Sequence, residues 1–158
     1  GSGYDIAVAK TQKSLLFWND NSEPNFKIIK FEPVFCKDLI FIHLNKKQDS
    51  REGIELYRSK EKMLYLVRRF SEITQSVLES PSLERFSELM QEHETLLSEF
   101  LGLQTDKKKY FEDCPSFVKS LGAWGGDFVM STKFENYKNY FQEKGFDVVI
   151  DWEVMIDS

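Results

Sequence analysis

Two glycine-containing stretches, at opposite ends of the chain, carry the residue types that could do chemistry. The first is residues 1–7, Gly-Ser-Gly-Tyr-Asp-Ile-Ala, in which Asp5 follows a flexible turn and precedes small apolar residues. Glycine lets a backbone approach a ligand closely, and a carboxylate held at such a place can accept a proton. The alternative is a frayed terminus, or an expression remnant at Gly1-Ser2, and the residues by themselves favour that alternative.

The second stretch is residues 119–127, Lys-Ser-Leu-Gly-Ala-Trp-Gly-Gly-Asp, which leads into the apolar residues 128–130. A glycine-rich turn before a strand can present backbone N–H groups to an anion. It is not a Walker A motif, because no Gly-Lys-Ser/Thr follows, and it lacks the Gly-x-Gly-x-x-Gly of dinucleotide-binding proteins. An ordinary tight turn is about equally compatible with these residues.

The other candidate residues are few. His43 and His93 are the only histidines and Cys36 and Cys114 the only cysteines, with no short spacing typical of a metal cluster. The isolated thiols indicate a reduced, cytoplasmic protein. His93 falls on an apolar helical stripe, which favours a satisfied core histidine over a ligand or a catalytic base. The basic run at 107–109 is interpreted as a solvated loop, with an anion site as the alternative.

Composition narrows the function classes. The chain has 158 residues, of which 41% are hydrophobic, and a net charge of −5. These values are typical of a globular chain and argue against disorder and against a nucleic-acid partner, which would need a basic face. No run of about 18 apolar residues and no secretory signal is present, so neither a membrane span nor a membrane partner is expected.

The elements that must position these residues form an α+β pattern, β-rich at first, then helical, then β-α-β. Extended runs are predicted at residues 4–8, 14–18 and 26–31, and a strand buried on both faces at 39–44. After them the apolar periodicity predicts a helix that continues or kinks, a helix restarting at Ser80-Pro81 and ending at Gly102, a short helix, a strand, a helix and a strand. These cover residues 50–78, 83–100, 111–121, 125–130, 133–144 and 148–150.

Together and in this order, the two stretches resemble the C-terminal part of the GHMP-family small-molecule kinases, the group of galactokinase, homoserine kinase, mevalonate kinase and phosphomevalonate kinase. Residues 3–7 match the family's Gly-x-Asp, which a small-residue strand follows, and Gly1-Ser2 is similar to the phosphomevalonate kinase variety. The family's Lys-x-x-Gly-Ala-Gly-Gly-Gly is matched at Lys119, Gly122, Ala123, Gly125 and Gly126. The likeness spans essentially the whole chain.

The resemblance implies a fold and a domain organisation. Residues 1–35 would be β-strands that complete the N-terminal kinase lobe, and residues 36–158 a ferredoxin-like α/β C-terminal lobe with several helices. Family members are about twice as long, and nothing here matches their phosphate-binding loop, Pro-x-x-x-Gly-x-x-Ser-Ser/Ala. The chain is therefore expected to be the second half of a kinase, inactive when isolated, whose partner is the missing N-terminal half or a second copy.

The resemblance also implies a function, the ATP-dependent phosphorylation of a small metabolite in isoprenoid biosynthesis, with mevalonate or phosphomevalonate as substrate and ATP and Mg²⁺ as cofactors. Asp5 would orient or deprotonate the acceptor. Trp124 departs from the family's glycine, which puts the substrate in doubt, because tryptophan disfavours a positive φ. The residues implied at the substrate site are Gly3, Tyr4, Gly122, Ala123, Trp124, Gly125 and Gly126.

The alternative is a function of another class, a non-catalytic binding or regulatory lobe that pairs with another chain. Exposed aromatic residues of the helix at 133–144 would form its contact surface. An amphipathic helix is more often packed on its own sheet, so that packing is favoured for this one. The aromatic residues concerned are Phe134, Tyr137, Tyr140 and Phe141.

Overall fold

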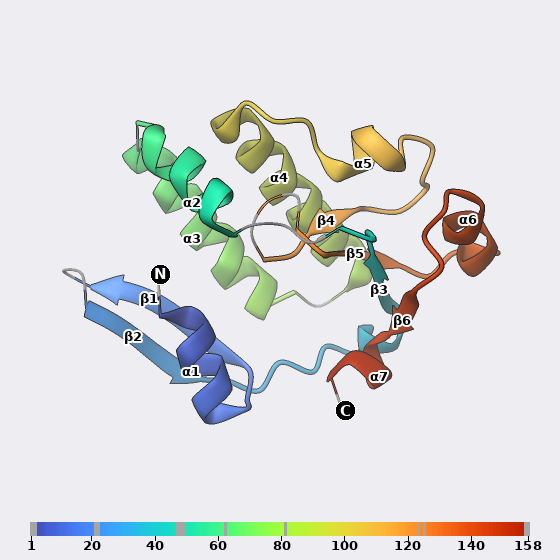
Figure 1. The fold of residues 1–158 in the computed structure, drawn as a ribbon. Helices are drawn as coiled ribbons and strands as arrows, with labels where there is room; N and C mark the ends of the chain where they lie inside the picture. The colour runs from blue at the N-terminus through green and yellow to red at the C-terminus, as the bar shows by residue number, and fades with distance from the viewer. Residues whose placement is uncertain are drawn as a thin grey trace. The chain divides into compact units, whose positions relative to one another are not determined.

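A computed structural model describes residues 3–20, 23–46, 50–61, 63–80, 82–122, 124 and 126–156 (Figure 1). The chain divides into two compact units, Gly1–Pro33 and Val34–Ser158. The described residues form seven helices, a two-stranded sheet and a four-stranded antiparallel sheet, so the predicted α+β class is confirmed. No helix within the described ranges is long and apolar enough to cross a lipid bilayer.

The first unit is a helix packed on a β-hairpin, shown in blue in Figure 1. Its elements are α1 (Tyr4–Thr11), β1 (Leu15–Asp20) and β2 (Glu23–Ile28), and the two strands pair antiparallel. The Tyr4 ring meets Phe17 of β1 edge-on at 5.9 Å between centroids. Ala7 of α1 is buried, so this small side chain lets the helix lie close to the hairpin.

The extended run predicted at residues 4–8 is wrong, because these residues begin α1. Gly3 takes a left-handed conformation (φ 84°) at the N-cap, and its carbonyl accepts the N–H of Ala7 at 3.1 Å. A short apolar run does not by itself distinguish a strand from a helix. Ala7 and Ala9 favour the helix, since alanine has the highest helix propensity.

The second unit is built on a four-stranded sheet in the order β4-β5-β3-β6. The central strand β3 (Leu39–His43) pairs antiparallel with β5 (Phe128–Thr132) and with β6 (Val149–Asp151), while β4 (Lys119–Ser120) pairs with β5. The first four residues of β3 are fully buried. The predictions that β3 is covered on both faces and shares a sheet with the strand after the glycine-rich stretch are confirmed.

The described part of the second unit also contains six helices, and a 3-10 turn (Cys36–Asp38) leads into β3. The helix predicted from residue 50 through Phe70, with a continuation or kink after it, is divided elsewhere: one helix ends at Ser59, and the next begins at Leu64 and runs to Leu78 without a break. The last short helix was not predicted. The helices are α2 (Ser50–Ser59), α3 (Leu64–Leu78), α4 (Leu83–Leu101), α5 (Asp106–Tyr110), α6 (Tyr137–Glu143) and α7 (Trp152–Ile156).

The ends of α4 follow partly from the sequence. Gly102 ends the helix in a left-handed conformation (φ 71°), as predicted. The restart at Ser80 is wrong, because Ser82 is the N-cap and its side chain accepts the N–H of Arg85 at 3.2 Å. Pro81 lies outside the described residues.

Two predictions between residues 105 and 121 are also wrong. The basic run at 107–109 is part of α5 and not a loop, since Thr105 caps this helix by accepting the N–H of Lys108 at 3.1 Å. Residues 111–118 form no helix, and β4 follows them. Pro115 lies in the middle of that segment, and a proline removes one helical hydrogen bond and clashes with the preceding turn.

One face of the sheet is covered by aromatic side chains. Ile40, Ile42 and Val129 pack with Phe111 and Phe141 in a fully buried cluster. Helix α6 therefore packs on its own sheet, and its aromatic residues do not form the exposed contact surface that the alternative function needed. Partly buried against the same cluster are Phe134, Tyr137 and Tyr140.

Candidate functional site

Asp5 lies in the first turn of α1, and it is exposed. A carboxylate at this position is stabilised by the free N–H groups and the positive end of the helix dipole. Gly3 makes the turn possible, because its φ of 84° is rarely adopted by other residues. The acidic group is thus held on a short, regular element with its oxygens open to solvent.

A cavity of about 200 Å³ lies between α1 and the hairpin of the first unit. Gly3 lines it, so one predicted substrate residue borders a cavity, whereas Tyr4 and Asp5 do not line it. Tyr4 is exposed, and its ring contacts Phe17. The other lining residues are Ile6, Ala7, Lys10, Phe17, Pro24 and Phe26.

The second glycine-containing stretch is the loop of the β4–β5 hairpin. Leu121 donates its N–H to the carbonyl of Phe128 at 3.0 Å, which closes the hairpin, and Leu44 donates its N–H to the carbonyl of Asp127 at 2.7 Å. The loop therefore lies at the end of the sheet where β3 finishes. Gly126 is buried, whereas Gly122 is exposed with a φ of 67° and open space around it.

Trp124 is half-buried in this loop. It is not among the described non-glycine residues with a positive φ, which are Gln12, Asn45 and Asn136. The left-handed conformation falls on Gly122 instead, so the tryptophan causes no such strain. Ala123 and Gly125, both predicted to line the substrate site, lie outside the described residues.

The structure thus brings the predicted site residues together in two groups. Gly3, Tyr4 and Asp5 lie at the start of α1 in the first unit, and Gly122, Trp124 and Gly126 lie in one hairpin loop of the second unit. Each group is described within its own unit.

A buried polar network lies directly before the loop. Ser120 donates its N–H to Glu94 Oε2 at 3.2 Å, and its hydroxyl lies 2.6 Å from Glu94 Oε1 and 2.7 Å from Asp106 Oδ2. The ammonium of Lys119 is 3.2 Å from Glu94 Oε2 and also donates to the Ser120 carbonyl at 2.6 Å. The network connects β4 with α4 and α5, and so fixes where the glycine-rich loop begins.

The sequence analysis missed Glu94 and Asp106, although a signal for each was present. Glu94 continues the i, i+4 series of Phe86 and Met90, so a carboxylate falls on the buried face of α4. Asp106 follows Thr105 at a helix start. A charge placed on an apolar stripe indicates a buried partner, which here includes Lys119.

His93 lies on the apolar side of α4, as predicted, with its ring centroid 4.8 Å from that of Phe70. Its Nδ1 atom is buried and has no hydrogen-bond partner among the described residues, so the prediction that this histidine is satisfied is wrong. Burial, and then the positive charge of Lys119, lowers the pKa of His93 to about 4. The imidazole is therefore neutral at physiological pH.

The described residues contain no group of three or more His, Cys, Asp or Glu side chains that could hold a metal ion. The carboxylates of the buried network already contact Ser120 and Lys119.

Comparison with known proteins gives a fold. No protein-family model and no curated protein sequence matches the chain. Among solved structures, the crystal structure of L. major mevalonate kinase in complex with R-mevalonate matches with a TM-score of 0.66 and 14% sequence identity. The match covers 91% of this chain and 48% of that one, so the chain spans about half the length of that kinase. At this identity the likeness shows a GHMP-kinase-like fold.

Proposed function

We propose that this chain supplies the second half of a GHMP-type kinase, which transfers a phosphoryl group from ATP to a hydroxyl or phosphate group of a small metabolite. The observation that carries the proposal is the fold likeness to mevalonate kinase over 91% of the chain. In this assignment the first unit belongs to the N-terminal lobe and the second unit is the C-terminal domain. The likeness supports mevalonate or phosphomevalonate as the acceptor.

Asp5 is the proposed catalytic carboxylate. Its exposure and its place in the first turn of α1 support the role, because a base must reach the acceptor hydroxyl before any tuning of its pKa matters. Phosphoryl transfer depends mainly on positioning and on charge neutralisation, so a carboxylate on a regular helix turn is well suited to orient the acceptor. Gly3 would contribute by making the turn before Asp5.

The glycine-rich loop is the second proposed part of the site. Gly122 has open space around it, so a ligand group can come close to the backbone there. The buried pair of Glu94 and Ser120 fixes the strand that leads into the loop. The half-buried Trp124 would border the substrate, together with Gly126 and, on the basis of the resemblance alone, Ala123 and Gly125.

ATP would bring the phosphates and, with them, Mg²⁺, which usually keeps several waters and is held by few carboxylates. No segment of these 158 residues matches the family's phosphate-binding loop. The proposal therefore assigns activity to a polypeptide in which these residues are joined to a segment with that loop, and no turnover to the 158 residues alone.

The test is a coupled assay of ATP turnover with mevalonate and with phosphomevalonate, using that joined polypeptide. Asp5→Asn keeps the shape and removes the charge, so kcat should fall by about two to four orders of magnitude while ATP affinity stays nearly unchanged. Glu84→Gln is the matched control, because Glu84 also lies in the first turn of a helix, α4, and has no part in the proposed site. An Asp5→Asn enzyme with undiminished kcat would rule out the role given to Asp5, and turnover by the 158-residue chain alone would refute the need for a second segment.

A further inference from the structure

Two ammonium groups converge on one tyrosine ring in the second unit. Lys46 follows β3, and Lys109 and Tyr110 end α5. Lys46 Nζ lies 4.5 Å and Lys109 Nζ 5.0 Å from the centroid of the Tyr110 ring. Lys46 also donates a hydrogen bond to the Tyr110 hydroxyl. Attraction to the ring thus holds two like charges close together.

No carboxylate among the described residues forms an ion pair with Lys46, Lys108 or Lys109. Desolvation, followed by the nearby charge of Lys109, lowers the pKa of the exposed Lys46, and the carboxylate of Asp106 acts in the opposite direction. The neighbouring Lys144 differs, because it lies 2.8 Å from Asp113 Oδ1. Lys46 and Lys109 therefore form no ion pair with a described carboxylate, although Asp106 lies near enough to act on Lys46.

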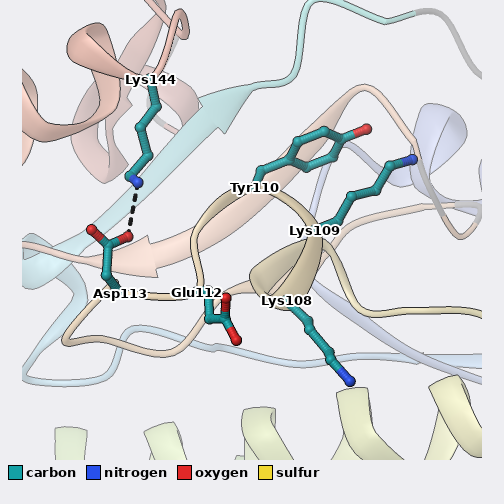
Figure 2. A pocket seen from close by; sticks show the side chains of 6 residues that line it. All are labelled: Lys108, Lys109, Tyr110, Glu112, Asp113 and Lys144. Carbon is teal, nitrogen blue, oxygen red and sulfur yellow. Dashed lines mark ion pairs between the residues drawn. The ribbon is translucent and has the colours of Figure 1, made fainter.

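An open cavity of about 400 Å³ is lined by Lys109 and Tyr110, and Lys46, which does not line it, contacts the same tyrosine ring. Figure 2 shows Lys109 running alongside the Tyr110 side chain, whereas Lys144 is turned toward Asp113. The cavity has ample room for two phosphate groups, and its size falls in the range of ordinary ligand sites. The residues that line it are Lys108, Lys109, Tyr110, Glu112, Asp113 and Lys144.

The two acidic residues of this cavity do not neutralise the lysines that face Tyr110. Asp113 Oδ1 already accepts hydrogen bonds from Lys144 and, at 2.7 Å, from the Tyr140 hydroxyl. These bonds lower the pKa of Asp113, which stays ionised and occupied by its own partners. Glu112 forms no ion pair with a described residue. On one side of the cavity the charge of Lys144 is neutralised by Asp113. On the other side, called the cationic side below, Lys109 lies against Tyr110 without an ion pair to a described residue.

The cationic side lies at the same end of the sheet as the glycine-rich loop. Leu44, two residues before Lys46, is hydrogen-bonded to Asp127 at the end of that loop. The Asn45 side chain donates to the carbonyl of Gly145 at 2.9 Å, which fixes the chain just before Lys46. The two residues before Lys46 are thus fixed by one main-chain and one side-chain hydrogen bond, which determines where Lys46 leaves the sheet.

We propose that Lys46 and Lys109, on the Tyr110 ring, bind a phosphate-bearing anion whose oxygens accept hydrogen bonds from both ammonium groups. Two convergent donors suit a ligand with several charged oxygens, and such charge-assisted bonds are the strong ones. The inference goes beyond the proposed kinase function, which gives no role to Lys46, Lys109 or Tyr110, and it stands if that function fails.

The test is isothermal titration calorimetry of the 158-residue chain with inorganic diphosphate, at constant ionic strength and without divalent ions. Saturable binding of one diphosphate is expected, and Lys46→Gln and Lys109→Gln should each weaken it about tenfold or more, since each removes one charged donor. Lys138→Gln is the matched control, because Lys138 is also an exposed lysine near a tyrosine ring, 5.8 Å from the Tyr137 centroid, without a second ammonium group. Its affinity should equal that of the parent chain.

A second measurement separates binding from folding. Both target lysines are exposed, so circular dichroism should show unchanged folding in either variant. In the parent chain, NMR titration of the lysine side chains should show the pKa of Lys46 rising when diphosphate is present. Absence of saturation up to about 10 mM diphosphate, or an equal loss of affinity in Lys138→Gln, would overturn the proposal by leaving only non-specific attraction.

Discussion

Glu94 and Ser120 hold each other by two hydrogen bonds, the Ser120 N–H to Oε2 at 3.2 Å and the Ser120 hydroxyl to Oε1 at 2.6 Å. This pair connects the middle of α4 to the short strand β4, two residues before Gly122. Both side chains are buried, so water cannot replace either bond without a rearrangement. The position of the glycine-rich loop thus depends on one carboxylate from a helix far away in the sequence.

The first prediction concerns that carboxylate. Glu94→Ala leaves the Lys119 ammonium without its partner in a site where the two side chains are 12% and 4% exposed, so the free energy of unfolding should fall by about 3–5 kcal/mol. Glu92→Ala, on the same helix, breaks a surface pair with Arg69 and should cost less than about 1 kcal/mol. Urea unfolding of both variants measures the difference. Equal losses in the two variants would contradict the buried network.

His93 predicts how stability depends on pH. Its pKa is about 4 in the folded chain and ordinarily 6.5, so between these values the unfolded chain binds more protons and stability rises with pH. Below pH about 4 the burial of His93 lowers the free energy of unfolding by about 3 kcal/mol, and this loss disappears as the pH rises to about 6.5. His93→Leu should flatten this part of the urea-unfolding profile. A profile unchanged in His93→Leu would exclude the burial assigned to this ring.

Substitution of Gly122 should lower stability through the backbone conformation alone. A Cβ there would meet nothing within 4 Å, so the left-handed φ of 67° is the whole penalty. Gly122→Ala should lower the free energy of unfolding by about 1 kcal/mol, and Gly122→Asn by less, because asparagine tolerates this conformation better. Thermal unfolding of the two variants provides the measurement. Asparagine and alanine variants of equal stability would show that the loop adopts another backbone.

Phe141 distinguishes a core role for α6 from an interaction surface. The residue is fully buried beneath the sheet, so Phe141→Ala should reduce the free energy of unfolding by about 3–5 kcal/mol. Val154→Ala, at an exposed position of α7, should change it by less than about 0.5 kcal/mol. Denaturant unfolding gives both values. A Phe141→Ala variant as stable as the parent chain would contradict the core role of α6 and favour an interaction surface.

Much of the sheet could be predicted because its strands are apolar in continuous runs. β3 is buried on both faces, and a run such as Leu39 to Ile42 leaves no polar face for solvent. The end of α4 at Gly102 was equally visible, since glycine commonly takes the left-handed conformation after a helix. In these places one local signal determines the outcome.

The remainder could not be predicted because local signals compete or because the cause lies far away in the chain. The five residues after Gly3 are too few to show a period, so the helix α1 resembled a strand. The burial of Glu94 depends on Lys119, Ser120 and Asp106, which tertiary packing alone brings to it. At the candidate site, Asp5 was visible as a residue, whereas its position in a helical turn was not.

The lengths of the edge strands determine how many backbone N–H and C=O groups are left without a neighbouring strand. The four-stranded sheet of the second unit ends in β4 on one side and β6 on the other, which have two and three residues, and β4 carries the charged Lys119. Such short, charged edges give an added strand few hydrogen bonds and so discourage aggregation by strand pairing. In the described residues, β1 and β2 of the first unit have six residues each and pair only with one another. Pairing with an added strand is therefore more favourable along the six-residue strands of the hairpin than along the short edge strands of the larger sheet.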